Sequence, residues 1–484
     1  MSTDLKRRNV PFSPPDMTER EAEEVKEAIL SGWITTGPRT KKLEKLVADY
    51  VGVSGGFAST GSAQAPVQKV PSCVCLNSAT AAMEMVLHIL GVGEGDEVIV
   101  PAYTYTASAS VVSHVGATVV LVDVQPDCLE MDYDKLEAAI TEKTKVVVPV
   151  DIAGIVCDYD RVREIVERKK ALFQPKNDIQ KLIGRVAISA DCAHSFGACR
   201  KVSMVSNGFN VSNSETSGTS ETLKPRMAMA GEIADFSSFS FHAVKNFTTA
   251  EGGAMTWNLP FGNEVVPQPF DNAQGKLVYC GSPVPFIEGE TWNEFIYRMS
   301  QLFSLHGQNK DALAKTKLGA WEYDIIGPWY KCNMTDVVAA IGLIQFERYP
   351  EMLAKRQKYV QMYNEGIDNL NANLDANHQV AYLNHKDADH CSSHHLYMVR
   401  LVGRTREEAN SVIEQMAERG IATNVHYKPL PMMTAYKALG FDIKNYPNAY
   451  NMFVNEITLP LNTKMTEEDV EYVIENFVEI VKSL

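Results

Sequence analysis

The sequence predicts an α/β protein in which a mostly parallel, seven-stranded sheet lies between helices and a smaller C-terminal α+β domain follows. Between residue 73 and about residue 257, apolar strands alternate with helical patterns. The strands contain runs such as Val-Ile-Val and Val-Val-Val without polar alternation, which is typical of strands covered on both faces. Beyond about residue 260 the alternation ends. We therefore expect a large α/β domain with an N-terminal arm over residues 1–260, and connecting helices with the small domain over residues 261–484.

The N-terminal arm contains two predicted helices. Thr18 and Glu21 form a capping box, and apolar residues follow on one face, so a helix is expected over residues 18–30. A glycine-bounded turn containing Trp33 separates it from a second helix at about 39–50.

The alternating region supplies the strands and helices of the expected sheet. The predicted strands are Cys73–Leu76, Glu97–Pro101, Thr118–Val124, Lys145–Val150, Arg185–Ala190, Asp235–Phe241 and Ala254–Trp257. The predicted helices cover residues 79–90, 104–114, 134–140 and 159–170.

Three segments interrupt this scheme. Residues 52–72 are rich in Gly, Ser and Ala and are predicted to form a loop. Residues 171–184 are expected to extend the preceding helix. Residues 200–230 are too polar to pack and are predicted to form a long surface excursion. In the C-terminal part we expect helices near 335–371, 404–419 and 466–482 and strands near 379–383 and 395–402.

Charge and composition exclude several classes of function. The net charge of −14 and the pI of about 5.4 argue against a nucleic-acid partner, which requires clustered Lys and Arg. The N-terminus lacks the apolar core of a secretory signal, and no stretch reaches the length of a membrane span. The nine cysteines are scattered, and Cys73-Val-Cys75 has poor spacing for zinc. We expect a cytoplasmic protein with reduced thiols, no membrane association and no bound metal.

Lys245 is the strongest candidate for a catalytic residue. It follows the apolar run Ala234–Val244 and precedes a Thr-Thr pair, a Gly-Gly turn and a second apolar strand. This order predicts strand, exposed turn and strand, with the lysine at the turn. Burial would lower the pKa of its amine and allow it to attack a carbonyl group. Taken by itself, the sequence around Lys245 is also compatible with an ordinary surface lysine.

Asp191 follows the preceding predicted strand. That strand is too apolar to leave a carboxylate unpaired without a large cost, and a buried pyridinium would keep the carboxylate ionised. An aspartate that accepts backbone N–H groups in a loop is the alternative. His194, three residues further on, is expected to orient this carboxylate or to contact a cofactor hydroxyl; a core histidine is the other interpretation.

Two further stretches fit a phosphate group and an aromatic ring. Ala79 and Thr80 lie between a strand and a helix, where small side chains and free N–H groups suit an anion, although an ordinary helix start has the same composition. The Ser240 hydroxyl, at a strand end, is a further candidate for the phosphate. Tyr105 lies deeper in its turn than Tyr103, so we choose it to stack on the ring; plain packing is the alternative.

A lysine and a carboxylate delivered by neighbouring strands are the arrangement that a pyridoxal 5′-phosphate (PLP) enzyme needs. The lysine forms the imine with the cofactor, and the aspartate pairs with the pyridinium nitrogen. The sequence therefore predicts PLP as the cofactor, with pyridoxamine phosphate present during turnover.

Several stretches together resemble the DegT/StrS-type sugar aminotransferases, a branch of the fold type I PLP enzymes in the aspartate aminotransferase superfamily. The resemblance covers most of the chain. Its most specific motifs are Asp191-Cys-Ala-His-Ser-Phe-Gly197 and Ser240-Phe-His-Ala-Val-Lys-Asn-Phe-Thr-Thr-Ala-Glu-Gly-Gly253. Further matches are Ser31–Pro38, Asn77–Ala82, Gly91–Pro101, Tyr330–Asp336, His426–Pro429 and Leu459–Leu461.

The resemblance implies a role for each site residue. Lys245 would be the aldimine lysine and the catalytic residue, and Asp191 the pyridinium partner. Tyr105 would stack on the ring, and Ala79, Thr80 and Ser240 would hold the phosphate. Asn333 would reach the phosphate of the neighbouring subunit in a homodimer with shared active sites. Trp33 and His426 match segments that line the sugar site.

The activity implied is transfer of an amino group from an amino acid, expected to be glutamate, to a nucleotide-linked ketosugar. The cycle would be ping-pong, in the biosynthesis of cell-surface polysaccharides or related amino sugars. The stretch Trp321–Asp324 with Tyr330–Asp336 is most similar to enzymes that aminate C4 of a 4-keto sugar. The insertions at 52–72, 171–184 and 200–230 make the chain longer than is usual for the family.

Two alternatives remain, one within PLP chemistry and one in another class. A PLP-dependent sugar dehydratase would have histidine in place of the lysine, so Lys245 argues against it. A non-catalytic, ligand-binding regulator with the same fold would keep Lys245 and Asp191 but transfer no amine.

Overall fold

The computed structural model describes residues 8–53, 70–203, 225–267, 276–279, 282–309 and 322–484. Its largest sheet has seven strands in the order β1-β9-β8-β5-β4-β2-β3. These strands are β1 (Cys73–Leu76), β2 (Glu97–Pro101), β3 (Thr118–Val122), β4 (Thr144–Val147), β5 (Ala187–Asp191), β8 (Phe236–Ser240) and β9 (Gly253–Trp257). All seven predicted strands are confirmed, and the sheet is parallel except for β9, which runs antiparallel to both of its neighbours.

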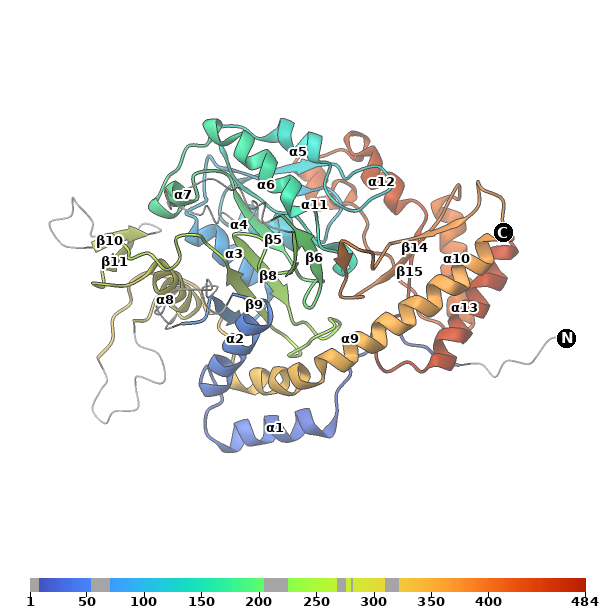
Figure 1. Ribbon diagram of the computed structural model, residues 1–484, viewed down its shortest axis with the longest axis horizontal. Helices are drawn as coiled ribbons and strands as arrows, with labels where there is room; N and C mark the ends of the chain where they lie inside the picture. The colour runs from blue at the N-terminus through green and yellow to red at the C-terminus, as the bar shows by residue number, and fades with distance from the viewer. Residues whose placement is uncertain (1–7, 54–69, 204–224, 268–275, 280–281, 310–321) are drawn as a thin grey trace, which may run out of the picture.

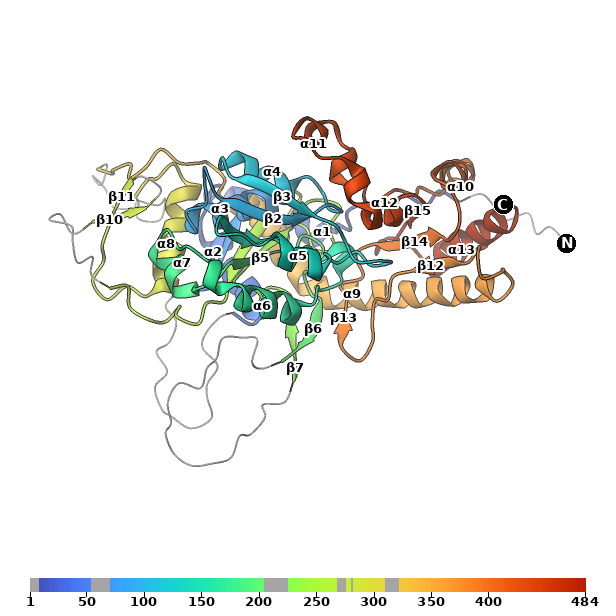
Figure 2. The same ribbon diagram turned by 90° about the horizontal axis from the view of Figure 1, so that it is seen from above.

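The sheet is covered on both faces, as the apolar strands predicted. Alternate residues of one strand enter different cores: Val98 and Val100 pack on one side and Ile99 on the other. The first core also contains residues of α3 (Ala79–Ile89), α4 (Ala107–His114), α7 (Asp178–Ile183) and α8 (Trp292–Ser304). The second contains residues of α2 (Pro38–Tyr50), α5 (Tyr133–Ala139), α6 (Tyr159–Arg168) and the start of α9 (Asp336–Asn371). Figure 2 shows strands β2, β3 and β5 between α4 on one side and α6 on the other.

The N-terminal helix α1 (Glu19–Leu30) begins with the predicted capping box of Thr18 and Glu21. It packs along the long helix α9. The second predicted helix corresponds to α2, with Pro38 in its first turn. Most of the predicted loop at 52–72, residues 54–69, lies outside the described residues.

The expectation that residues 171–184 extend a helix is wrong. Helix α6 ends at Arg168, a short 3-10 turn covers Lys170–Leu172, and a separate short helix, α7, begins only after a non-helical stretch. Pro175 lies in this stretch, and Asn177 caps α7 by accepting a hydrogen bond from the N–H of Gln180 at 2.8 Å. A proline and a capping asparagine both favour a new helix start over a continuous helix.

The expectation of one polar excursion over residues 200–230 is also wrong at its ends. Strands β6 (Cys199–Val202) and β7 (Arg226–Met229) pair with each other, and β6 pairs with β13 (His390–Cys391). Arg226 and Glu232 form an ion pair beside β7. Residues 204–224 lie outside the part of the chain that is described.

The C-terminal part has its own sheet and core. Strands β12 (Val380–Tyr382), β14 (Tyr397–Leu401) and β15 (Glu456–Leu459) form an antiparallel sheet. It packs with α10 (Arg406–Glu418), α13 (Glu467–Lys482) and the end of α9. The short helices α11 (Thr434–Ala438) and α12 (Pro447–Phe453) pack instead into the first core of the large sheet. The antiparallel pair of β10 (Lys276–Tyr279) and β11 (Ser282–Pro285) lies at the opposite end of the molecule from the C-terminal sheet (Figure 1). Figures 1 and 2 show α9 running from the large sheet to this C-terminal core.

The division of the chain at residue 260 remains a prediction. Residues just beyond it, such as Trp292 and Phe295 of α8, pack into the core of the large sheet. None of the helices in the described ranges combines the length and the hydropathy that a transmembrane segment requires.

The topology places several chain segments at one edge of the large sheet. Strands β5 and β8 are parallel neighbours, with Asp191 opposite Ser238, so the segments that follow them emerge side by side. The segment after β2 emerges at the same edge. In parallel α/β sheets, ligands bind at this carboxyl edge.

Candidate active site

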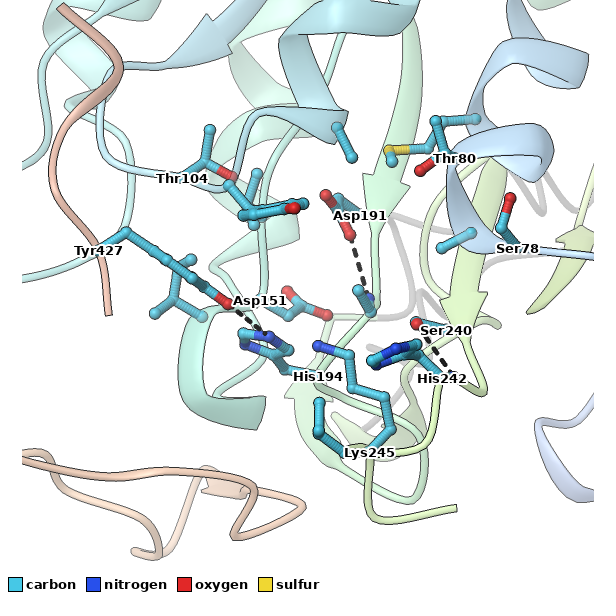
Figure 3. Close-up of a pocket in the computed structure, with 18 of the residues that line it drawn as sticks. Ser78, Thr80, Thr104, Asp151, Asp191, His194, Ser240, His242, Lys245 and Tyr427 are labelled. Atoms are coloured by element: carbon cyan, nitrogen blue, oxygen red, sulfur yellow. Dashed lines mark hydrogen bonds between the residues drawn. The ribbon is translucent and has the colours of Figure 1, made fainter. Parts of the chain in front are cut away.

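A cavity of about 380 Å³ lies at the carboxyl edge of the large sheet. It brings together segments that follow β1, β2, β4, β5 and β8, and Tyr427 from the C-terminal part (Figure 3). Seven of the ten residues that the sequence predicted for the site line this cavity: Ala79, Thr80, Tyr105, Asp191, His194, Ser240 and Lys245.

Lys245 lies in a tight connection between β8 and β9. Its backbone N–H donates to the carbonyl of His242 at 2.9 Å, and the hydroxyl of Thr248 donates to the carbonyl of Phe241. The side chain points into the cavity (Figure 3). Burial lowers the pKa of the amine to about 8, although the nearby carboxylate of Asp191 acts in the opposite direction. The free amine is therefore accessible near neutral pH, as a nucleophile requires.

Asp191 ends β5 and is buried. Its Oδ2 accepts a hydrogen bond from the Ser108 hydroxyl at 2.7 Å, and its Oδ1 accepts one from the N–H of Ala193 at 3.1 Å. Burial raises the pKa of the carboxyl group, while the two hydrogen bonds and the charge of Lys245 oppose the shift. A cationic group bound in the cavity would compensate the buried charge, since a buried carboxylate is costly without a partner.

His194 has a defined tautomer. Its Nδ1 accepts a hydrogen bond from the backbone N–H of Ala153 at 3.2 Å. Burial lowers the pKa of the imidazole well below its usual value, so the ring is neutral and its proton lies on Nε2. This nitrogen donates to the Tyr427 hydroxyl at 3.1 Å, which is visible in Figure 3. The predicted contact with the Asp191 carboxylate is absent from the hydrogen bonds of the described residues.

The start of α3 lines one side of the cavity. Ser78 caps the helix by accepting a hydrogen bond from the N–H of Ala81 at 3.1 Å, and Ala79 and Thr80 face the cavity. Strand β9 passes directly beside this turn. A Cβ atom at Gly253 would overlap the carbonyl carbon of Ser78 and lie 2.5 Å from the nitrogen of Ala79. Glycine at this position therefore allows the helix N-terminus and the strand to meet, which creates a small, amide-rich site for an anion.

Replacing Gly253 by alanine is expected to separate β9 from α3. The added methyl group meets backbone atoms, which cannot rotate away, so we expect a loss of roughly 1–3 kcal/mol in the free energy of unfolding and weaker cofactor binding. Urea unfolding and a PLP titration measure both effects. Gly93→Ala is the matched control, because a Cβ there would lie 3.6 Å from the nearest heavy atom. Equal stability and PLP affinity in the two variants would contradict this account.

The two tyrosines after β2 have different surroundings. Tyr105 lines the cavity, is 59% exposed and has its ring centroid 5.8 Å from that of Tyr427. Tyr103 is fully buried, and its hydroxyl donates to the carbonyl of His426 at 2.8 Å. Of these two tyrosines, Tyr105 is therefore the one that can present an aromatic face to a ligand in the cavity.

Three predicted residues lie outside the lining of this cavity. The Asn333 amide donates to the Thr36 hydroxyl at 2.6 Å, on the N-terminal side of α9. Asn333 is not the N-cap of α9, because Thr335 occupies that position. Trp33 lies in the turn after α1. His426 directly precedes the lining residue Tyr427.

The sequence interpretation missed several residues of the site. Ser108 donates a hydrogen bond to Asp191 but is the second residue of α4, where a serine carries no signal of a catalytic role. Asp151 borders the cavity, and its oxygens accept hydrogen bonds from the Tyr159 hydroxyl at 3.0 Å and the Ser195 hydroxyl at 2.7 Å. Tyr427 directly follows the predicted His426, and an aromatic residue next to a predicted site residue was the one sequence signal that could have identified it.

Comparisons with curated relatives agree with this geometry. The model of the DegT/DnrJ/EryC1/StrS aminotransferase family matches residues 15–266 and 290–478. The spore coat polysaccharide biosynthesis protein SpsC of Bacillus subtilis is 29% identical over 479 residues, with 98% of this chain and 97% of SpsC covered. The protein MJ1066 of Methanocaldococcus jannaschii is 30% identical, with 97% of each chain covered.

Solved structures give the same result. The PLP form of Spr1654 from Streptococcus pneumoniae, which is assigned as a sugar aminotransferase, is 46% identical with a TM-score of 0.78, and 98% of this chain and 99% of that chain are covered. Its pyridoxamine phosphate (PMP) form is 48% identical, also with a TM-score of 0.78, over 98% of this chain and 100% of that one. PseC of Helicobacter pylori shares the fold at 21% identity and a TM-score of 0.70, over 99% and 100% of the two chains.

The predicted fold type and cofactor are thereby confirmed. The non-catalytic alternative is not supported. The chain belongs to the DegT/DnrJ/EryC1/StrS aminotransferase family and is a PLP-dependent aminotransferase.

Proposed function

We propose that this aminotransferase moves an amino group from glutamate to a nucleotide-linked ketosugar by a ping-pong cycle. The observation that carries the proposal is the presence of Lys245 and Asp191 in one cavity beside the helix start at Ala79 and Thr80. The assignment of Spr1654 as a sugar aminotransferase, and the naming of SpsC for polysaccharide biosynthesis, favour a sugar acceptor. The pathway would be the synthesis of a cell-surface polysaccharide or a related amino sugar.

Lys245 and Asp191 carry the chemistry in this proposal. When bound, PLP supplies an electron sink for the bond changes at the substrate Cα. Lys245 holds the cofactor through its amine and, once displaced by substrate, moves the proton at the substrate Cα. Asp191 keeps a positive charge on the ring nitrogen, and Ser108 fixes the direction of that carboxylate.

The remaining lining residues hold and orient the cofactor. The N–H groups at the start of α3, together with the hydroxyl groups of Thr80 and Ser240, bind the phosphate. Tyr105 would stack on one face of the ring. His194, neutral and held by Ala153, lies on the cavity wall beside Lys245, where its ring would border the cofactor.

The proposal includes a homodimer with shared sites. Asn333 lies outside this chain's own cavity, and a second subunit is expected to receive it near the cofactor phosphate. Trp33 and His426 are expected to lie toward the sugar. Tyr330 and Ile325, close to Asn333 in sequence, are 45% and 46% exposed, which suits a surface that a second subunit covers.

The low pKa of Lys245 leads to a pH prediction for cofactor capture. In cofactor-stripped protein, the rate of PLP attachment is expected to rise with pH and to level off above about 8, because only the unprotonated amine reacts. If the pKa of Lys245 had the ordinary value of 10.5, the rate of PLP attachment would still rise between pH 9 and pH 10. Stopped-flow absorption at a series of pH values distinguishes the two curves.

The acceptor is tested with [15N]glutamate and a panel of nucleotide-linked 3-keto and 4-keto sugars. We expect mass spectrometry to detect 15N in the product of a 4-keto sugar, because residues 330–336 resemble those of enzymes that aminate C4. Trp321, the first residue of the other matching stretch, lies outside the described residues. Loss of water without 15N incorporation would favour the dehydratase alternative. Transfer to α-keto acids alone would contradict a sugar acceptor.

A further inference from the structure

His426 is connected to a buried carboxyl group through a threonine hydroxyl. The Glu456 Oε1 and the Thr458 Oγ1 are 2.5 Å apart, and the Thr458 Oγ1 and the His426 Nδ1 are 2.9 Å apart. Glu456 and Thr458 are two residues apart on β15, so both side chains point to the same face of the sheet. The other carboxyl oxygen, Oε2, accepts a hydrogen bond from the backbone N–H of His426 at 3.0 Å.

The His426 imidazole is neutral at physiological pH. Burial lowers its pKa to about 4, and the positive charge of Lys245 acts in the same direction. A neutral imidazole carries one proton, on either Nδ1 or Nε2. Nε2 has no hydrogen-bond partner among the described residues, and the His426 side chain is only half-buried. Nε2 is therefore the ring atom that remains for a ligand.

The chain of three groups has two arrangements that satisfy every donor and acceptor. If Glu456 is ionised, the Thr458 hydroxyl donates to the carboxylate, the His426 Nδ1–H donates to Thr458, and Nε2 is an acceptor. If Glu456 is protonated, its O–H donates to Thr458, the Thr458 hydroxyl donates to Nδ1, and the proton of His426 lies on Nε2. One proton on Glu456 thus reverses the hydrogen-bonding character of Nε2.

We propose that Glu456 and Thr458 are positioning residues that set the tautomer of His426, and that with Glu456 protonated His426 presents an N–H donor to an anionic oxygen of the substrate. The substrate part of this inference rests on the proposed function, in which His426 lies toward the sugar and, because the cycle is ping-pong, glutamate and the sugar occupy the same cavity in turn. The relay itself depends only on the geometry of the three groups.

The surroundings of Glu456 determine which state prevails. Burial raises the pKa of the carboxyl group to about 8, and the hydrogen bonds from Thr458 and the His426 N–H, with the charge of Arg406, oppose the shift. The titratable and charged groups that face it come from four neighbouring segments: Tyr103, Arg400, Arg406, His426 and Tyr427. At pH 7 the protonated state dominates, and it is lost as the pH rises through about 8.

The tautomer can be read by NMR on PLP-loaded protein with 15N-labelled histidine. The His426 signals are those missing from His426→Asn. In the wild type we expect the Nε2-protonated tautomer at about pH 6.5 and the Nδ1-protonated tautomer at about pH 9.5. A tautomer that is constant over this range would overturn the relay.

Two substitutions test the direction of the relay. In Glu456→Gln, the backbone N–H of His426 needs the amide oxygen as its acceptor, so the amide NH2 faces Thr458 and donates to its hydroxyl oxygen. The Thr458 hydroxyl then donates to Nδ1, and the Nε2-protonated tautomer of His426 should persist at every pH. Thr458→Val should abolish the transition, whereas Thr458→Ser should keep it. A transition that survives in Thr458→Val would also overturn the relay. Glu475→Gln, at an exposed position of α13, is the matched control and should titrate like the wild type.

Kinetics tests the role toward substrate. The probe is L-glutamate in the first half-reaction, followed by the absorption of the cofactor. We expect KM in the wild type to rise about tenfold from pH 7 to pH 9 with little change in the limiting rate, and KM in Glu456→Gln to stay flat. Parallel pH dependence of KM in both proteins would contradict the substrate role. If glutamate does not react with any variant, the proposed function fails, and the NMR experiment still decides the relay.

Discussion

Replacing Lys245 by alanine is expected to reduce turnover by roughly 10³-fold or more. The substitution removes both the amine that holds the cofactor and the base that moves the proton at the substrate Cα, and loss of a general base alone costs about 10²–10⁴-fold. The measurement is kcat with glutamate as donor, together with the absorption spectrum of the bound cofactor, which should also change.

The control for this variant is Lys437→Ala, which removes an exposed lysine on α11. It should retain wild-type turnover. Added methylamine should partly restore activity to Lys245→Ala, because a small free amine can supply the missing base, whereas a folding defect would not respond. Activity within tenfold of the wild type in Lys245→Ala would contradict the role given to this residue.

Replacing Asp191 by asparagine is expected to reduce kcat/KM by about 10²–10³-fold and to weaken PLP binding. The shape is retained, and an asparagine oxygen can still accept from Ser108 or from Ala193. The charge beside the cofactor ring nitrogen is lost, and breaking a buried ion pair typically costs about 3–5 kcal/mol. The half-reaction with glutamate and a PLP titration report the two effects.

Asp151→Asn provides the matched comparison. Asp151 is also buried beside the cavity, but its oxygens are satisfied by protein groups: Tyr159, Ser195 and the N–H of Cys157. Its replacement should lower thermal stability more than it lowers cofactor affinity. If Asp191→Asn keeps kcat/KM within threefold of the wild type, Asp191 does not act on the cofactor.

The large sheet was predictable because each of its strands is an uninterrupted apolar run. Such runs occur where both faces are covered, and the connecting helices carry clear periodicity. Lys245 and Asp191 were predictable for a related reason. Each stands where a buried strand ends, and parallel neighbours bring their carboxyl ends together.

The misassigned segments lack such a pattern. Strand β6, at the start of the 200–230 segment, pairs with β13 almost 200 residues further along the chain. Strand β7, at the end of that segment, pairs with β6, so no local signal marks either strand. Helix α8, which packs against α3 and β1, was not predicted, although it begins with a capping box of Thr291 and Glu294 like the one that marks α1. The break between α6 and α7 was readable from Pro175 and Asn177, but the apolar residues around it resembled a continuing helix.

Polar contacts within the site were the least predictable part. Ser108 reaches Asp191 from 83 residues away, and Tyr427 reaches His194 from 233 residues away. The link from Glu456 to His426 likewise depends on how β15 lies against the segment before Tyr427. Serine, threonine and tyrosine are common at ordinary surface positions, so only the folded arrangement gives them a role.

The most direct test of the central claim is the absorption spectrum of the PLP-loaded protein before and after addition of glutamate, followed by a nucleotide-linked 4-keto sugar. We predict that the long-wavelength cofactor band disappears with glutamate, returns with the sugar, and does neither in Lys245→Ala. A band that glutamate leaves unchanged, in protein that binds PLP fully, would contradict an aminotransferase that uses glutamate through Lys245.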